Sequence, residues 1–96
     1  MLTKLTLETR LKELKPVLTD RYFVSKIGYF GSFATGNPTE NSDVDILVEL
    51  SQPLGWEFFD LSDLLEHKLE RKVDLVSIKA LKPQLKDHIL SEVKYV

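Results

Sequence analysis

Apolar residues in the first part of the chain recur at helical spacing. Four leucines, separated by four, three and four positions, fall on one face of an amphipathic helix: Leu7, Leu11, Leu14 and Leu18. Thr6 is a candidate N-cap, because its hydroxyl can accept a hydrogen bond from a free amide of the first turn. Pro16 lacks an amide donor and clashes with the preceding turn, so we expect a first helix over about residues 6–15, followed by a second short turn or a kinked continuation to about residue 21.

Two strands are predicted after this helix, with a polar loop between them. Residues 23–30, FVSKIGYF, are rich in β-branched and aromatic side chains and run into a tight turn at Gly31-Ser32. Turn-forming residues then fill positions 36–42, GNPTENS, and the apolar run over residues 44–50 follows as the second strand.

The second half of the chain is predicted to alternate helix, strand and helix. Between residues 56 and 71 the apolar positions again fall at helical spacing: Phe58, Leu61, Leu64, Leu65 and Leu69. Residues 72–78, KVDLVSI, are predicted to form a third strand, and Pro83 opens a last helix that carries Leu85 and Ile89, with Val93 as a further candidate. The order α-β-β-α-β-α predicts an α/β (α+β) fold: one small domain over residues 1–96, with a short mixed sheet flanked by helices.

Length, charge and composition exclude several classes of function. A chain of 96 residues is the size of one domain, and no apolar run reaches the length of a membrane span. The first residues alternate charge and leucine, which is unlike a secretory signal. The formal charge of −2, with interspersed signs, disfavours direct binding of nucleic acid. The absence of cysteine excludes disulfides and thiolate metal sites and fits a cytoplasmic protein. Because no apolar run could span a bilayer, we expect no membrane partner.

Two aspartates lie at the start of the second predicted strand. Side chains two positions apart on a strand point to the same face, so Asp43 and Asp45 converge on one site. Taken alone, Asp43 fits equally well as a turn-forming acid after Asn41-Ser42. As a pair, the two carboxylates would repel each other unless a cation lies between them, which favours a divalent metal.

A third carboxylate and a glycine-serine turn extend this candidate site. Asp74 lies in the third predicted strand, and it would join the pair if that strand lies beside the second. Three oxygen ligands without His or Cys suit Mg²⁺ or Mn²⁺ better than zinc. Gly31 allows close approach of a ligand to the backbone, while Ser32 and a following helical turn offer donors to phosphate oxygens. The combination indicates a nucleotide and phosphoryl transfer.

The spacing of these residues resembles a known signature. Gly31-Ser32, ten further residues and then Asp43-Val44-Asp45 resemble the GS-x10-DxD motif of the DNA polymerase beta type nucleotidyltransferase superfamily. The later VDLV at residues 73–76 and the ending LSEVKYV are similar to the minimal nucleotidyltransferase (MNT) domain proteins of that superfamily, over nearly the whole chain. The resemblance implies an enzyme that transfers a nucleoside monophosphate, usually AMP from ATP, and releases pyrophosphate.

The resemblance also implies a role for each residue of the motif. Gly31 and Ser32 match the positions that hold the nucleotide phosphates, and Asp43 and Asp45 match the two metal-binding acids. Asp74 matches the third acid, which ligates one metal and activates the acceptor hydroxyl. Two Mg²⁺ ions, or Mn²⁺ in their place, are implied as cofactors, with ATP as substrate. Thr35 departs from the pattern, because many relatives carry an arginine there that contacts phosphate.

The family suggests a protein partner. Stand-alone MNT proteins are implied to be antitoxins of toxin–antitoxin modules, and their partner is a helical HEPN-domain RNase toxin. The resemblance therefore implies a hetero-oligomer in which AMP is transferred to a tyrosine hydroxyl of the toxin. One alternative is an antitoxin that neutralises the toxin by covering it, with a vestigial or regulatory nucleotide site. A third, disfavoured because 96 residues leave no room for a substrate domain, is adenylylation of a small molecule such as an aminoglycoside.

The remaining polar and aromatic residues have simpler expected roles. His67 and His88 are expected to be solvated, and the basic residues Lys68, Arg71 and Lys72 to form the solvated end of a helix. Of the three aromatic residues that open the long helix, one or two are expected to pack inward, with the rest available to a partner: Trp56, Phe58 and Phe59.

Overall fold

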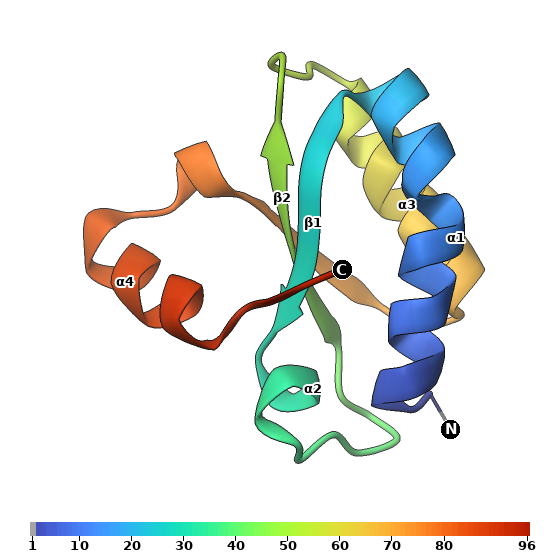
Figure 1. Ribbon diagram of the computed structural model, residues 1–96, viewed down its shortest axis with the longest axis vertical. Coiled ribbons are helices and arrows are strands. Elements are labelled where there is room, and N and C mark those ends of the chain that lie inside the picture. Colours follow the sequence, from blue (N-terminus) through green and yellow to red (C-terminus); the bar gives the residue numbers. More distant parts are fainter. Residues whose placement is uncertain (1) are drawn as a thin grey trace.

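The computed structural model describes residues 2–96 as four helices, a short 3-10 turn and four strands (Figure 1). The helices are α1 (Lys4–Tyr22), α2 (Ser32–Thr35), α3 (Glu57–Leu69) and α4 (Pro83–Glu92), and the 3-10 turn is η1 (Ile78–Ala80). The strands are β1 (Val24–Phe30), β2 (Val44–Leu50), β3 (Val73–Ser77) and β4 (Lys94–Tyr95). The predicted α+β class, with a mixed sheet flanked by helices, is confirmed, and α2, η1 and β4 are additions to the predicted order.

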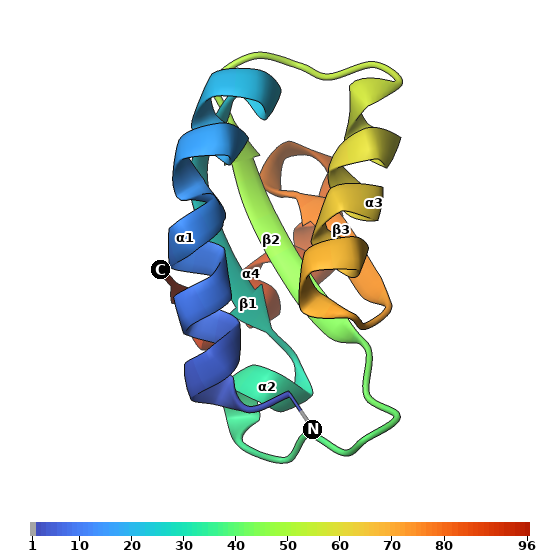
Figure 2. The same ribbon diagram turned by 90° about the vertical axis from the view of Figure 1, so that its right-hand side faces the viewer.

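One mixed sheet, in the order β3-β2-β1-β4, organises the chain. β1 pairs antiparallel with β2 on one side and with β4 on the other. β2 and β3 run parallel, with α3 as the crossover between them (Figure 2). This crossover brings the starts of β2 and β3 to the same edge of the sheet, and β1 ends at that edge.

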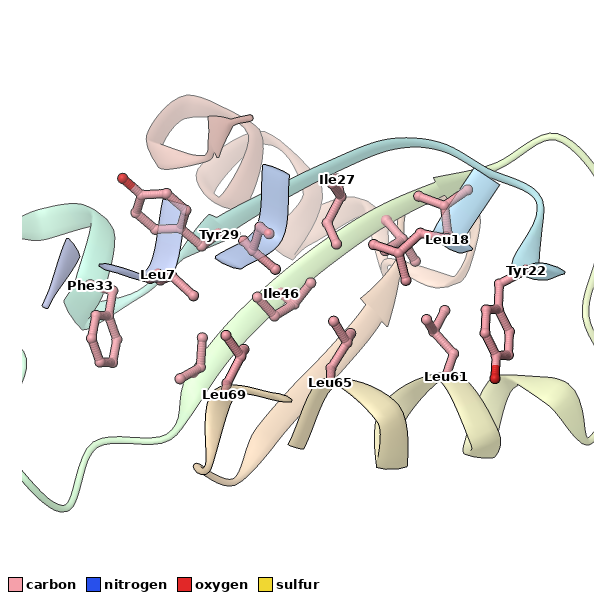
Figure 3. Close-up of a cluster of buried hydrophobic side chains, with 14 of the residues drawn as sticks. Leu7, Leu18, Tyr22, Ile27, Tyr29, Phe33, Ile46, Leu61, Leu65 and Leu69 are labelled. Carbon is pink, nitrogen blue, oxygen red and sulfur yellow. The ribbon is translucent and has the colours of Figure 1, made fainter. Parts of the chain in front are cut away.

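The two faces of the sheet are covered by different helices. α1 and α3 lie side by side on one face, and their apolar stripes enclose the main core with alternate residues of β1 and β2 (Figures 2 and 3). The labelled members of this core are Leu7, Leu18, Tyr22, Ile27, Tyr29, Phe33, Ile46, Leu61, Leu65 and Leu69. On the opposite face, Ile89 of α4 packs on Phe30 and Leu47 in a second, smaller cluster. The sheet is therefore buried on one face and only partly covered on the other.

Helix α1 differs from its prediction at both ends and in the middle. Its N-cap is Thr3, whose hydroxyl accepts a hydrogen bond from the Thr6 amide at 3.1 Å, so Thr6 lies inside the first turn. The helix also continues through Pro16 to Tyr22, because its buried leucine face is anchored on the sheet while Pro16 lies on the exposed side, where water can satisfy the carbonyl that loses its partner. No helix within residues 2–96 is both long and apolar enough to cross a membrane.

The last residues form a strand where the prediction extended α4. Helix α4 ends at Glu92, Val93 is already extended, and β4 pairs with Gly28 and Tyr29 of β1. Gly28 makes this pairing possible, since a Cβ there would lie 2.8 Å from the Lys94 carbonyl oxygen and 2.9 Å from Cγ2 of Val93. A strand of two residues has no periodicity of its own, so the sequence pattern could not predict it.

Candidate active site

The strand register brings two of the predicted acids together. Asp45 is the second residue of β2 and Asp74 is the second residue of β3, and the parallel ladder pairs them directly. Asp43 immediately precedes β2. Leu47, two positions after Asp45, packs in the α4 cluster, so the Asp45 side chain lies on the face of the sheet that α4 only partly covers. Asp43, Asp45 and Asp74 therefore share one edge and one face of the sheet.

The three carboxylates differ in exposure and interact electrostatically. Asp43 and Asp74 are exposed, whereas Asp45 is partly buried. Burial, followed by the nearby charges of Asp74, Asp43 and Glu92, raises the pKa of Asp45 from 3.8 to about 6. Four carboxylates, Asp45 and the three that surround it, thus lie close enough to repel one another, and a bound cation would offset that repulsion.

The chemistry of this acid cluster fits a hard divalent cation. Its donors are carboxylate oxygens, the ligands that Mg²⁺ and Mn²⁺ prefer. Within residues 2–96, no three His, Cys, Asp or Glu side chains already stand at coordinating positions. Asp43 and Asp74 are exposed, so both carboxylates are accessible from solvent.

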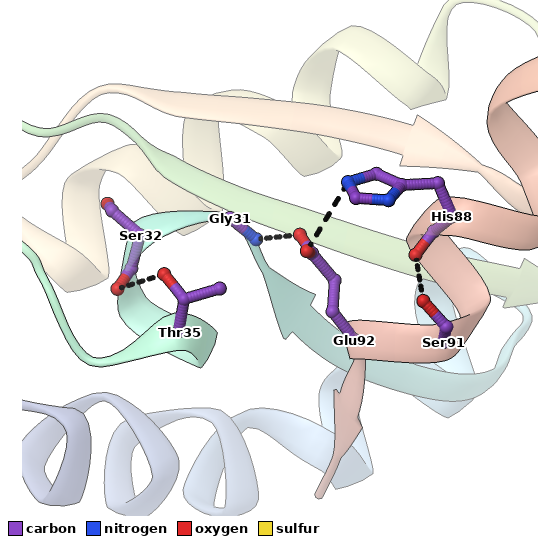
Figure 4. A network of polar contacts seen from close by, with 6 residues as sticks. All are labelled: Gly31, Ser32, Thr35, His88, Ser91 and Glu92. Atoms are coloured by element: carbon purple, nitrogen blue, oxygen red, sulfur yellow. Dashed lines mark hydrogen bonds and ion pairs between the residues drawn. The ribbon is translucent and has the colours of Figure 1, made fainter.

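Gly31 links the end of β1 to the acids. Its backbone has φ +70° and ψ −149°, and a Cβ at this position would lie 2.0 Å from Oδ2 of Asp45. Only glycine avoids both the strained backbone and the clash. Ser32 then begins α2, and Thr35 ends it as an exposed residue whose hydroxyl lies 3.5 Å from the Ser32 carbonyl oxygen (Figure 4). The turn that the sequence singled out therefore lies against Asp45.

One residue of α4, Glu92, reaches this turn, and His88 contacts Glu92; neither contact was predicted. The Gly31 amide donates a hydrogen bond of 2.8 Å to Oε1 of Glu92, and Nε2 of His88 lies 3.5 Å from Oε2 of Glu92 (Figure 4). The prediction for His88 was a solvated role. Its ring is exposed, but it also contacts a carboxylate of the site. Sequence spacing gives no signal for Glu92, because about sixty residues separate it from Gly31.

Arg71 was predicted to be a solvated end of a helix, and this prediction is wrong. Its guanidinium donates hydrogen bonds to the carbonyl oxygens of Thr39 at 2.9 Å and Ser42 at 3.4 Å. It also lies 5.7 Å from the ring centroid of Phe33, close enough for a cation–π contact. Arg71 thus holds the loop that leads into Asp43.

One hollow of the described surface lies away from the acids. It measures about 660 Å³ and is apolar, and it lies at the far ends of β2 and β3: its lining includes Leu50, Leu54, Phe58 and Ser77. Phe58 packs inward, as expected for part of the aromatic trio, whereas Trp56 is 84% exposed and Phe59 is 61% exposed. The acid cluster itself is open to solvent, so an acceptor molecule could reach it from outside.

Comparison with known proteins gives a consistent result. The family model for polymerase beta nucleotidyltransferases matches residues 12–96. Protein adenylyltransferase MntA of Thermococcus cleftensis is 41% identical over 97 residues, covering 100% of this chain and 98% of its own. A proposed protein adenylyltransferase of Methanocaldococcus jannaschii is 43% identical over 88 residues, covering 90% of each chain.

Solved structures share the same architecture. A proposed minimal nucleotidyltransferase superimposes with a TM-score of 0.84 at 30% identity, over 97% of this chain and 95% of the other. A toxin–antitoxin structure with AMP-PNP superimposes with a TM-score of 0.74 at 26% identity, over 90% of this chain and 70% of the other.

Proposed function

Because this chain belongs to the polymerase beta nucleotidyltransferase family, we propose that it is an antitoxin that transfers AMP from ATP to a tyrosine hydroxyl of a HEPN-domain RNase toxin. The pairing of Asp45 with Asp74 beside the Gly31 turn is the observation that carries this proposal. The 41% identity with an adenylyltransferase named MntA, over the whole chain, supports a protein acceptor. The open acid cluster supports an acceptor supplied by another chain.

Each site residue has a defined part in the proposed reaction. Asp43, Asp45 and Asp74 would hold two Mg²⁺ ions, or Mn²⁺, which supply positive charge to the triphosphate and to the departing pyrophosphate. Gly31 and Ser32, which lie beside Asp45, would orient the phosphates toward the ions that the acids would hold. Asp74, exposed at the edge of the site, would accept the proton of the tyrosine hydroxyl as its oxygen bonds to the α-phosphorus and pyrophosphate leaves.

The proposal is tested by transfer of label from ATP to the toxin. Purified chain, Mg²⁺, ATP labelled at the α-phosphate and the HEPN toxin are expected to give a labelled toxin. Asp43→Asn with Asp45→Asn is expected to lower the rate by more than about 100-fold, since loss of groups that only orient metal ligands already costs about 10–100-fold. A matched control, Asp60→Asn with Asp63→Asn, makes the same change on exposed residues of α3 and should label at the normal rate. Normal labelling by the Asp43/Asp45 variant would contradict the site.

A second candidate function is neutralisation of the toxin by binding alone. Thr35, the last residue of α2, favours binding alone. Many relatives carry an arginine at this position, and threonine offers no positive charge to the phosphates. Exposed Trp56 and Phe59 offer apolar surface for a partner. In this case the Asp43→Asn, Asp45→Asn variant would still protect RNA from the toxin at equal molar ratio. Loss of protection together with loss of labelling would exclude binding alone.

A further inference from the structure

Glu92 brings a fourth carboxylate to the acid cluster. It is the last residue of α4, its side chain is only 22% exposed, and it is one of the charges that raise the pKa of Asp45. A negative charge in this place is unfavourable by itself. Its two carboxylate oxygens make separate contacts: Oε1 accepts the 2.8 Å hydrogen bond from the Gly31 amide, and Oε2 lies 3.5 Å from Nε2 of His88 (Figure 4).

The Gly31 amide depends on that carboxylate for an acceptor. β1 ends at Phe30, and an amide that precedes the first turn of a helix has no acceptor within that helix. Glycine is also the residue whose backbone has the widest freedom, so its conformation must be set by its contacts. Asp45 occupies the space beside the Gly31 α-carbon, and Glu92 accepts the hydrogen bond of the Gly31 amide. The two contacts together restrict the backbone conformation of Gly31. Both contacts are made by the residue that directly precedes Ser32.

Glu92 is itself held by the end of the chain that follows it. The Val93 amide donates to the Ile89 carbonyl at 2.9 Å, and β4 then pairs with β1. Beyond β4, the Val96 amide donates to the Ile27 carbonyl at 3.0 Å. β1 also leads directly into Gly31. The position of β1 therefore fixes both the donor, Gly31, and the acceptor, Glu92, of this hydrogen bond.

We propose that Glu92 is a positioning residue: through the Gly31 amide it holds the Gly31-Ser32 turn in the orientation that the phosphates of the nucleotide require. The inference rests on the proposed function, since the reaction supplies the phosphates. It needs the hydrogen-bond acceptor of Glu92 at its present reach, and it does not need the negative charge. A metal ligand or a proton acceptor at Glu92 would instead need the negative charge of the carboxylate. A group that competes with phosphate for the Gly31 amide would weaken nucleotide binding, whereas a positioning residue supports it.

Three substitutions separate these roles. Glu92→Gln keeps the length of the side chain and an acceptor oxygen, Glu92→Asp keeps the charge but shortens the reach, and Glu92→Ala removes the acceptor. For a positioning residue, kcat of AMP transfer is expected to stay within about threefold in Glu92→Gln and to fall about 10–100-fold in Glu92→Asp and Glu92→Ala, with KM for ATP changing less than kcat. Asp87→Ala, an exposed acid of α4, is the matched control and should leave both constants unchanged.

Other results would overturn the proposal. Equal loss of kcat in Glu92→Gln and Glu92→Ala would show that the charge is required. A lower KM for ATP in both, with kcat unchanged, would show that Glu92 competes with the nucleotide. If Glu92→Ala does not fold, the kcat values of Glu92→Gln and Glu92→Asp are compared instead. A positioning role requires Glu92→Gln to be the more active of the two, and the reverse result would contradict it.

An arm without the toxin keeps this test independent of the proposed function. The chain contains four glycines, so the Gly31 amide can be assigned in a ¹⁵N–¹H correlation spectrum of the free protein. Its proton resonance is expected to shift upfield and its hydrogen exchange to accelerate in Glu92→Ala and Glu92→Asp, but not in Glu92→Gln or Asp87→Ala. An unchanged Gly31 resonance in Glu92→Ala would refute the positioning role even if the wild-type chain labels the toxin. Absence of labelling by the wild-type chain would instead refute the proposed function.

Discussion

The charge of Asp45 lowers the stability of the metal-free protein, although the proposed reaction needs that charge to hold a metal ion. It is partly buried among three other acids, and its pKa of about 6 lies above the value of 3.8 expected in an unfolded chain. The folded protein therefore binds a proton more tightly than the unfolded chain, so folding stability falls as pH rises from about 4 to above 6. The cost of burying the charged Asp45 carboxylate, together with its repulsion by the neighbouring acids, is fully present at neutral pH and absent below about pH 4.

Replacing Asp45 should consequently stabilise the protein while removing a metal ligand. Asp45→Asn is expected to raise the free energy of unfolding of the metal-free protein by about 1 kcal/mol at pH 7.5, after allowance for solvent screening of a partly exposed group. Denaturant titrations at pH 7.5 and pH 4 measure this, and the gain should vanish at pH 4. Asp60→Asn on the exposed face of α3 is the control. A loss of stability at pH 7.5 would show that Asp45 makes favourable contacts that outweigh the repulsion.

The two glycines that flank α2 allow backbone strain to be separated from a steric clash. Both have positive φ, +70° at Gly31 and +92° at Gly36, but a Cβ at Gly36 would meet nothing within 4 Å. Gly36→Ala should cost about 1 kcal/mol of unfolding free energy, from the backbone alone. Gly31→Ala should cost about 2–4 kcal/mol, because the new Cβ also meets Asp45. Chemical denaturation of both variants measures the difference, and equal costs would indicate that Asp45 moves aside freely.

At the level of elements, Arg71 joins the end of α3 to the loop before β2. Arg71→Ala removes both hydrogen bonds to the Thr39 and Ser42 carbonyls, and about 1–2 kcal/mol of unfolding free energy is expected to be lost. Arg71→Lys should recover only part, since an ammonium does not present the planar fork that spans two carbonyls. Denaturant unfolding measures stability, and hydrogen exchange of residues 39–43 reports the loop. Lys68→Ala, an exposed change near the same helix end, is the control, and equal effects of the two alanine variants would contradict the role of Arg71.

Elements with strong periodicity could be predicted from the sequence, and short or tertiary features could not. The leucine stripe of α1 and the apolar runs of β1 and β2 identified those elements, because burial of one face imposes a period. The end of the first helix that was expected before Pro16 was wrong, because packing of the whole helix outweighed a local preference. Of the candidate site, the spacing of Gly31, Asp43 and Asp45 was visible along the chain. The contribution of Glu92 depends on where α4 and β4 come to lie, which no local pattern encodes.

For the molecule as a whole, the residues of the acid cluster come from strands that are joined in two different ways. Gly31 follows β1 and Asp45 lies in β2, antiparallel neighbours joined by residues 31–43, whereas Asp74 arrives on β3 after the α3 crossover, about thirty residues later. Closing that longer segment is the step that brings Asp74 against Asp45, so the repulsion among the acids opposes the docking of β3 and spares the β1–β2 pair. β3 is also an edge strand, bonded to the sheet along one side only. In the absence of metal, the pairing between β2 and β3 is therefore weakened at the end that carries the acids.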